Sequence, residues 1–187
     1  MNRQQLAHVL RAAARITDGA EIIVIGSQAI LGSHDADHLP ARVTLSIEAD
    51  LAFRDDPSET KSDKVDGAIG ELSAFHDTFG YYGQGVSVTT AILPDGWRER
   101  LVRFDREDAT PAVAWCLEKH DLVVSKLVAG RQKDVEFAEA LLGGGLVDVV
   151  LLEQRARMLD APRAVIDRVL TSVERCVRRV GMPPGAM

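Results

Sequence analysis

Apolar and polar residues alternate over residues 43–51, and no other pattern in the chain restricts its fold as strongly. Side chains point alternately to the two faces of a β-strand, so this alternation predicts a strand with one buried face and one polar face. Glu48 and Asp50 are two positions apart and would project from the same polar face. The apolar positions are Val43, Leu45, Ile47, Ala49 and Leu51.

An apolar run that ends in a Gly-Ser pair precedes this strand. Glu21 to Ile25 predicts a buried strand, Gly26-Ser27 a turn, and Gln28 to Leu31 the first turn of a helix. Glycine permits a close backbone approach, and backbone N–H groups at such a turn, with the Ser27 hydroxyl, can hold a phosphate oxygen. The turn and the two acids are expected on neighbouring strands.

Two carboxylates that point to one side repel each other unless a cation lies between them. Mg²⁺ favours such oxygen ligands and completes its shell with water and substrate phosphates. Bound ions of this kind activate an attacking oxygen and neutralise charge on a leaving pyrophosphate. Alternating polar residues are also typical of a solvated strand face, and Gly-Ser turns are common, so the pattern alone leaves both interpretations open.

The remaining periodicity predicts two different halves. The first half mixes helices and strands, and the second is helical throughout. We therefore expect an α/β core over residues 1–117 and a helical C-terminal region over residues 118–187. Expected helices are 2–17, 57–76, 120–129, 133–142, 147–159 and 162–180, and further expected strands are 86–92, 98–104 and 112–117.

A lysine lies within an apolar helical stretch of the second half. Lys126 either extends to solvent or reaches into a cleft to meet nucleotide phosphates as a point charge. Arg131, Lys133 and Asp134 follow closely after Gly130. They form either a solvated turn with local ion pairs or part of the same site.

Together, Gly26-Ser27, Glu48-Ala-Asp50-Leu51 and Lys126-x4-Arg131-x-Lys133-Asp134 resemble a known family. The family is the minimal nucleotidyltransferases related to the toxins of AbiE-type and MenAT-type toxin–antitoxin systems. Those toxins look like DNA polymerase β-type nucleotidyltransferases with a helical C-terminal domain. The likeness spans about residues 20–140. It implies an α/β (α+β) nucleotidyltransferase-like core with a mixed sheet, followed by a helical C-terminal region.

The resemblance also implies an activity: metal-dependent transfer of a nucleotide from an NTP to a tRNA end or a protein. A role as the toxin of a toxin–antitoxin system, with a cognate antitoxin as partner, is consistent with the resemblance. The resemblance assigns triphosphate binding to Gly26 and Ser27, and Mg²⁺ (or Mn²⁺) binding to Glu48 and Asp50. Lys126 would contact the phosphates, and Arg131 and Lys133 would support the phosphate site. Asp134 would position the acceptor or assist proton removal.

The sequence departs from the family pattern in three places. Glu48 stands where the family usually has Asp, and its side chain is one methylene longer. Gly130 occupies the usual Ser/Thr position. A third acid is not evident, because the expected strand 86–92 offers Ser87 and Thr89 instead. These departures keep a second hypothesis open, namely a catalytically weak or inert nucleotidyltransferase-fold binding or interaction module.

Composition narrows the expected setting. The net charge of -6 argues mildly against a nucleic-acid coating role. No segment approaches the roughly 20 apolar residues of a membrane span, and no secretion signal is apparent. Cys116 and Cys176 are far apart in the sequence, and each lies in an apolar context. We therefore expect two buried thiols and a reducing compartment. We expect a cytoplasmic protein with no membrane partner.

The last predicted helix carries arginines that share one face, namely Arg168, Arg175 and Arg179. They form either a solvated face or an RNA-backbone patch.

Overall fold

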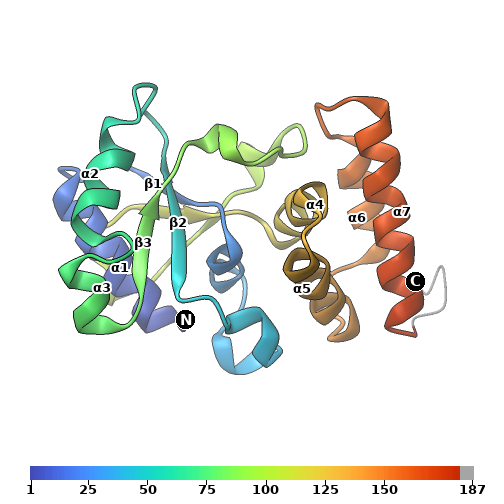
Figure 1. Cartoon of the computed structure of the whole chain (residues 1–187), viewed down its shortest axis with the longest axis horizontal. Helices are drawn as coiled ribbons and strands as arrows, with labels where there is room; N and C mark the ends of the chain where they lie inside the picture. The colour runs from blue at the N-terminus through green and yellow to red at the C-terminus, as the bar shows by residue number, and fades with distance from the viewer. Residues whose placement is uncertain (182–187) are drawn as a thin grey trace.

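The computed structural model describes residues 1–181 of the 187-residue chain. A five-stranded sheet runs through the molecule, with one group of helices on one side and a second group on the other (Figure 1). The order of the strands across the sheet is β3-β2-β1-β5-β4. Their bounds are β1 (Ile22–Val24), β2 (Glu48–Phe53), β3 (Tyr82–Gly85), β4 (Val102–Arg103) and β5 (Ala114–Cys116).

The sheet is mixed in direction. Strand β1 runs antiparallel to β2 and parallel to β5, β2 runs parallel to β3, and β4 runs antiparallel to β5. The Ile25 N–H, just after β1, donates to the Asp50 carbonyl at 3.1 Å. This bond places the exit of β1 beside the acidic part of β2. The predicted α/β (α+β) core with a mixed sheet, followed by a helical region, is confirmed.

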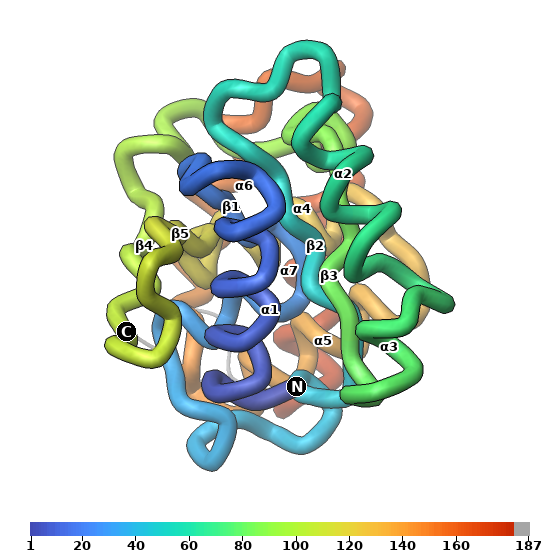
Figure 2. Tube along the Cα trace, turned by 90° about the vertical axis from the view of Figure 1, so that its left-hand side faces the viewer, coloured from blue at the N-terminus to red at the C-terminus, as the bar shows by residue number. Residues whose placement is uncertain are grey.

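Three helices lie on the first side of the sheet, as Figure 2 shows for α1, α2 and α3. They are α1 (Arg3–Ile16), α2 (Thr60–Ile69) and α3 (Ala74–Phe79). Helix α1 begins with a capping box at Asn2 and buries Leu6, Val9 and Leu10 completely. The helix predicted for residues 2–17 is therefore confirmed.

The second group of helices follows the sheet in sequence. Its members are α4 (Lys119–Ala129), α5 (Gln132–Gly143), α6 (Val149–Arg157) and α7 (Arg163–Arg179). All four were predicted, and their ends differ from the predictions by one or two residues. Helix α4 packs against α5, α6 and α7. The boundary predicted between residues 117 and 118 falls in the connection between β5 and α4, but a division into separate domains stays a prediction.

Among residues 1–181, no helix has the length and apolar content needed to cross a membrane. Cys116 and Cys176 are both free thiols buried in the core, as expected from their apolar surroundings. Burial raises the pKa of the Cys116 thiol to about 12 and that of Cys176 to about 11, so neither is an activated thiolate.

The strand predicted for residues 43–51 begins only at Glu48, so the first half of that prediction is wrong. Its start lies in a 3₁₀ helix, and Leu45 and Ile47 are 72% and 47% exposed. The reason is that β1 offers only three residues for pairing, so no neighbouring strand extends along residues 43–46. The Ser46 carbonyl instead accepts from the Gln28 side chain at 2.8 Å.

The helix predicted for residues 57–76 is interrupted and forms α2 and α3. Gly70 ends α2, and a Cβ there would lie 2.2 Å from the Asp66 carbonyl oxygen. Leu72 has a φ of 61°, and the Ser73 side chain then caps α3 by accepting from the His76 N–H. A strong N-cap inside a helical pattern therefore starts a new helix.

The strand predicted for residues 86–92 is also wrong, because β3 comes earlier. A Cβ on Gly83 would lie 2.8 Å from Val9 Cγ1, and one on Gly85 would lie 1.9 Å from the Ser62 carbonyl oxygen. Glycine thus allows α1 and α2 to pack directly on β3.

The strands predicted for residues 98–104 and 112–117 are both shorter in the structure. The first three residues of the strand predicted for residues 98–104 lie in a 3₁₀ turn, where Arg100 bonds Asp121 at 2.8 Å, and only Val102–Arg103 form a strand, β4. The strand predicted for residues 112–117 is present as the shorter β5, and the turn after Gly26 is 3₁₀ rather than α-helical. The 3₁₀ helices are η1 (Ser27–Gly32), η2 (Ala36–His38), η3 (Ala41–Thr44), η4 (Val88–Thr90), η5 (Trp97–Arg100) and η6 (Glu107–Ala109).

Candidate active site

The Gly26-Ser27 turn provides the space for the second acid of β2. A Cβ on Gly26 would lie 1.5 Å from Asp50 Oδ2 and 2.4 Å from Asp50 Cγ. The Asp50 carboxylate therefore lies directly against the Gly26 backbone. The φ of Gly26 is -87°, an ordinary value, so the position requires glycine for space and not for backbone conformation.

Glu48 and Asp50 lie on the same face of β2, while Ala49 and Leu51 between and beyond them are fully buried. Burial raises the pKa of Glu48, and repulsion from the Asp50 carboxylate raises it further. Burial also raises the pKa of Asp50, and attraction to Lys126 reverses only part of that effect. The two carboxylates therefore lie where a cation would be favourable.

The corner between α4 and α5 brings three charged side chains together. Gly130 ends α4 in the left-handed region at a φ of 67°, and α5 begins two residues later. Lys126 Nζ then lies 3.4 Å from Asp134 Oδ1, and Arg131 Nε lies 2.6 Å from Asp134 Oδ2. Lys126 extends into the cleft, with a side chain only 13% exposed.

Asp134 is 1% exposed and holds its charge in this position. Burial alone would raise its pKa, but the hydrogen bond from Arg131 and the Lys126 ammonium outweigh burial and lower the pKa. A carboxylate with a lowered pKa is a weak proton acceptor. Its contacts favour a positioning role for the two cations over proton removal.

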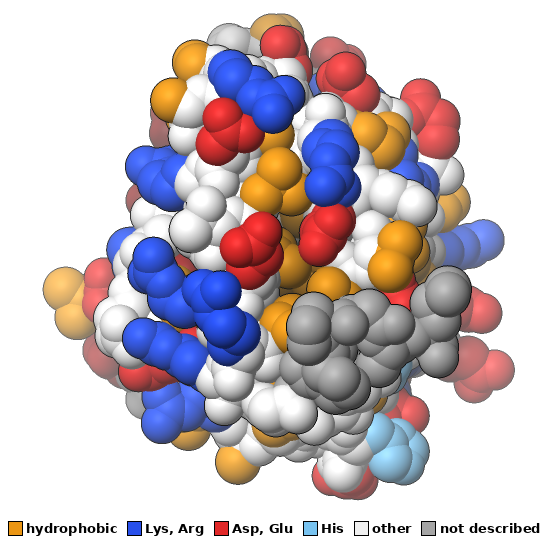
Figure 3. Space-filling view, turned by 90° about the vertical axis from the view of Figure 1, so that its right-hand side faces the viewer, with side chains coloured by type: hydrophobic (Ala, Val, Ile, Leu, Met, Phe, Trp, Pro, Cys, Tyr) orange, Lys and Arg blue, Asp and Glu red, His pale blue; other side chains and the backbone are white. Residues whose placement is uncertain are grey.

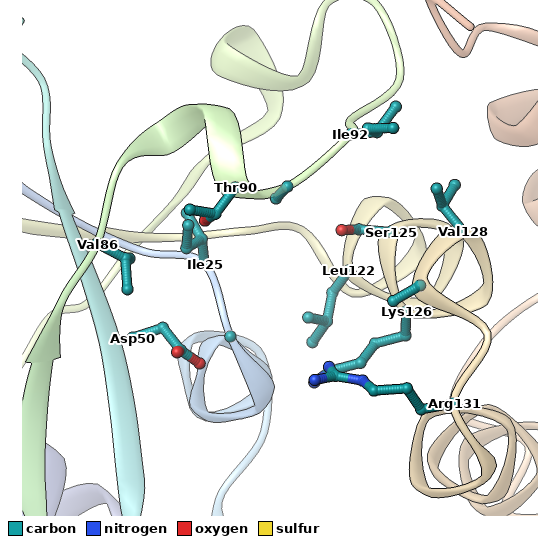
Figure 4. Close-up of a pocket in the computed structure, with 13 residues that line it drawn as sticks. Ile25, Asp50, Val86, Thr90, Ile92, Leu122, Ser125, Lys126, Val128 and Arg131 are labelled. Atoms are coloured by element: carbon teal, nitrogen blue, oxygen red, sulfur yellow. The ribbon is translucent and has the colours of Figure 1, made fainter. Parts of the chain in front are cut away.

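Asp50 of β2 faces Lys126 and Arg131 of the α4–α5 corner across one cleft (Figure 4), and Glu48 lines the same cleft. The cleft consists of two adjoining cavities that share Asp50, Lys126 and Arg131. The first cavity, of about 390 Å³, contains Gly26; the second, of about 380 Å³, contains Ser27, Glu48, Lys133 and Asp134. Every predicted site residue thus lines this cleft, although the roles assigned to them stay predictions.

The first cavity has apolar side chains in two of its walls that the sequence did not reveal. One wall comes from the segment after β3, where Ile92 and Thr90 lie on the cavity side in Figure 4, and the other comes from α4, with Leu122, Ser125 and Val128. Because Ser125 directly precedes Lys126 in the sequence, it could have been predicted to line the same cavity. Nothing in the pattern of residues 86–92 pointed to a cavity wall.

Glu48 and Asp50 are the acids of β2 that line the cleft. Among residues 1–181, no group of three or more His, Cys, Asp or Glu side chains forms a metal-binding cluster. The residue in register with Asp50 on β3 is Gln84, whose amide donates to Asp66, and Ser87 and Thr89 line a separate cavity. Two carboxylates still suit Mg²⁺, which commonly takes one or two protein carboxylates and draws its other ligands from phosphates and water.

The arginine face of α7 is only partly free of protein contacts. Arg168 donates to the Val128 carbonyl at 3.0 Å, and Arg179 pairs with Glu139 at 2.9 Å. Figure 3 shows basic side chains interspersed with acidic and apolar ones on the side of the molecule formed by the helices. The RNA-backbone patch stays a prediction.

One family model matches residues 4–168 of the chain, and its description is "Nucleotidyltransferase of unknown function (DUF6036)". No curated protein and no solved structure matches the chain. The match covers most of the sequence and includes both the acidic strand and the α4–α5 corner. The chain therefore belongs to this family of nucleotidyltransferases.

Proposed function

We propose that the cleft transfers a nucleotide from an NTP to an acceptor in a metal-dependent reaction. The observation that supports this proposal most strongly is the arrangement of Glu48 and Asp50 opposite Lys126 and Arg131. Phosphoryl transfer needs little covalent chemistry from the protein and depends on positioning and charge neutralisation. A cleft that combines paired acids with clustered cations supplies both requirements.

Glu48 and Asp50 would hold Mg²⁺ or Mn²⁺. When bound, the metal would supply charge neutralisation on the phosphates and a lowered pKa of the attacking hydroxyl. The two carboxylates would hold that ion at a fixed place on β2, and the close approach of Asp50 to Gly26 restricts the rotation of the Asp50 side chain. The raised pKa values of both acids are consistent with a site completed by a cation.

The two cavities suit two parts of a nucleotide. The cavity with Ser27, Lys126 and Lys133 suits the triphosphate, because its hydroxyl and ammonium groups donate to phosphate oxygens. The more apolar cavity with Leu122 and Ile92 suits the nucleoside. Asp134 then orients Lys126 and Arg131 toward the phosphates through its ion pairs.

The resemblance to the AbiE-type and MenAT-type toxins supports a narrower form of the proposal. In that form the acceptor is a tRNA end or a protein, and the chain acts as the toxin of a toxin–antitoxin system with a cognate antitoxin. The Lys126-to-Asp134 motif supports this relation most specifically, because its residues also meet in space.

The test is a labelling reaction. Purified protein is incubated with each α-labelled NTP, Mg²⁺ or Mn²⁺, and total tRNA. We expect label on the RNA or on the protein itself, and a loss of orders of magnitude in rate for Asp50→Ala and Lys126→Ala. Arg163, 82% exposed and paired with Asp167 on α7, provides the control variant Arg163→Ala. Robust labelling by Asp50→Ala would refute the mechanism.

Glu48 supports a second candidate, a weak or inert module that keeps the fold and binds a partner. Its longer side chain places the carboxylate farther from β2 than the usual aspartate would. If wild-type protein labels nothing with any NTP, Glu48→Asp is the decisive variant. Labelling gained by Glu48→Asp would identify the natural chain as the inert form, and continued absence of labelling would count against the catalytic cleft itself.

A further inference from the structure

The triphosphate cavity contains a cation that lies outside the motif of Lys126, Arg131 and Lys133. Arg42, on η3, lines this cavity and pairs with Glu136 of α5. Since η3 packs against α5, the ion pair joins the two walls of the cleft. Glu136 is held in place by a second contact, a hydrogen bond of 2.9 Å from the Gln132 side chain.

Two acids of α5, Asp134 and Glu136, neutralise the cations that line this cavity. Asp134 pairs with Lys126 and Arg131 from a buried position, and Glu136 pairs with Arg42. The two pairings differ in strength because they differ in exposure. Asp134 is 1% exposed, whereas the side chains of Arg42 and Glu136 are 56% and 32% exposed. Exposed ion pairs contribute little to stability, so a phosphate can displace Glu136 easily.

The position of Arg42 indicates which phosphate it meets. Lys126 is deep in the cleft near Asp50, with a side chain 13% exposed, and Arg42 lies nearer the solvent. A triphosphate whose reacting phosphate lies at Asp50 would extend its terminal phosphate outward. Guanidinium groups bind phosphate oxygens in a two-pronged geometry, so Arg42 can exchange the carboxylate of Glu136 for a phosphate.

We infer that Arg42 binds the terminal phosphate of the NTP, and that Glu136 holds it in place until the nucleotide enters. This inference rests on the proposed function. It assigns to Arg42 the discrimination between a nucleoside triphosphate and its diphosphate. It also predicts that the ion pair across the cleft opens whenever a triphosphate is bound.

The test measures binding of inorganic tripolyphosphate, a probe that needs no knowledge of the base, and of the common nucleoside diphosphates, which lack the terminal phosphate. Calorimetry in Mg²⁺ buffer is done on the full chain. We expect Arg42→Ala to weaken tripolyphosphate binding roughly tenfold to hundredfold, as for loss of a charge-assisted hydrogen bond, and to weaken binding of the nucleoside diphosphates much less, because they lack the terminal phosphate. Arg42→Lys should recover only part of the loss. Glu136→Gln should bind tripolyphosphate at least as tightly as wild type, because Arg42 is released.

The matched control is Arg157→Ala. Arg157 is also 56% exposed and pairs with Glu153, which is 36% exposed, but it lies on α6, and neither cavity of the cleft includes it. An Arg42→Ala protein that binds tripolyphosphate within twofold of wild type, as Arg157→Ala should, would overturn the inference alone. A wild-type protein that binds neither tripolyphosphate nor any NTP would overturn the triphosphate site, and with it the proposed function.

Discussion

At the scale of single residues, the position of the Asp50 carboxylate depends on the absence of a side chain at Gly26. The carboxylate occupies the space that a Cβ on Gly26 would need. A Gly-Ser turn is common in proteins, so the sequence could suggest Gly26 but could not show this contact. The contact depends on β1 and β2 being neighbours in the sheet, which is a tertiary fact.

Gly26→Ala is predicted to displace Asp50 and to abolish Mg²⁺-dependent nucleotide binding while the protein stays folded. The reason is the 1.5 Å separation between an added Cβ and Asp50 Oδ2. Calorimetry with NTP and circular dichroism would measure both properties. Gly67→Ala is the control, because no atom lies within 4 Å of an added Cβ at this position in α2. It should bind as wild type does and gain about 0.5–1 kcal/mol from its better helix propensity.

Asp134→Asn is predicted to lower the free energy of unfolding by about 1–3 kcal/mol at pH 7, because it breaks a buried ion pair with partly exposed partners. The pKa of Asp134 is lowered in the folded state, so its charge stabilises the fold above the ordinary aspartate pKa. That contribution disappears as the pH falls through the lowered folded-state pKa. Urea unfolding as a function of pH should therefore show the wild-type and Asp134→Asn curves converging in acid.

The control for that experiment is Asp167→Asn, which removes an exposed ion pair with Arg163 on α7. Its effect should stay below about 1 kcal/mol, as is usual for surface pairs. Equal destabilisation by the two substitutions, or a constant difference between wild type and Asp134→Asn down to low pH, would contradict the assignment of a lowered pKa to Asp134.

At the scale of elements, the four helices of the second half were predictable almost to their ends, whereas the bounds of the strands were not. Each helix of the second half shows an apolar stripe that its own residues reveal, and all four were found within two residues of their ends. Strands β1, β4 and β5 have three residues or fewer, which is too short for a period to appear. The start of β2 and the place of β3 are set by partner strands and by glycines packed under α2, so local pattern misplaced both.

The segment between β3 and β4 is held by a buried ion cluster rather than by the sheet. Asp121 is 0% exposed and accepts from Arg100 at 2.8 and 3.2 Å, and Arg155 Nε lies 3.4 Å away. Arg100 also donates to the Asp95 carbonyl at 2.9 Å. This cluster links the segment that carries the cavity wall of Ile92 to α4 and α6.

Arg100→Ala is predicted to destabilise the fold by about 3 kcal/mol, because it leaves the buried Asp121 carboxylate with only Arg155 as a partner. It should also raise the KM for NTP, since the wall formed by Ile92 loses its anchor. Urea unfolding and steady-state kinetics measure the two effects. Arg98→Ala, on the same turn, removes an exposed side chain stacked 4.4 Å from the Trp97 ring and should cost less than about 1 kcal/mol. Similar losses for both variants would show that the turn, and not the ion cluster, matters.

At the scale of the whole molecule, the candidate site exists only where the sheet and the helical region meet. The acids come from β2 and the cations from the α4–α5 corner, two parts that are far apart in the sequence. The sequence suggested these groups because two acids share one face of a strand and a lysine lies within an apolar helix. It could not suggest Arg42, Thr90 or Ile92, because exposed or loop residues show no such signal and become cavity walls only in the folded chain.

The central claim is that Glu48, Asp50 and the facing cations form a metal-dependent nucleotide site. Calorimetric titration of NTP into wild-type and Asp50→Ala protein, each with Mg²⁺ and with EDTA, tests it most directly. The account predicts binding by wild type only with Mg²⁺, and a loss of that binding in Asp50→Ala. Equal affinity of wild-type protein for NTP with and without metal would contradict the account.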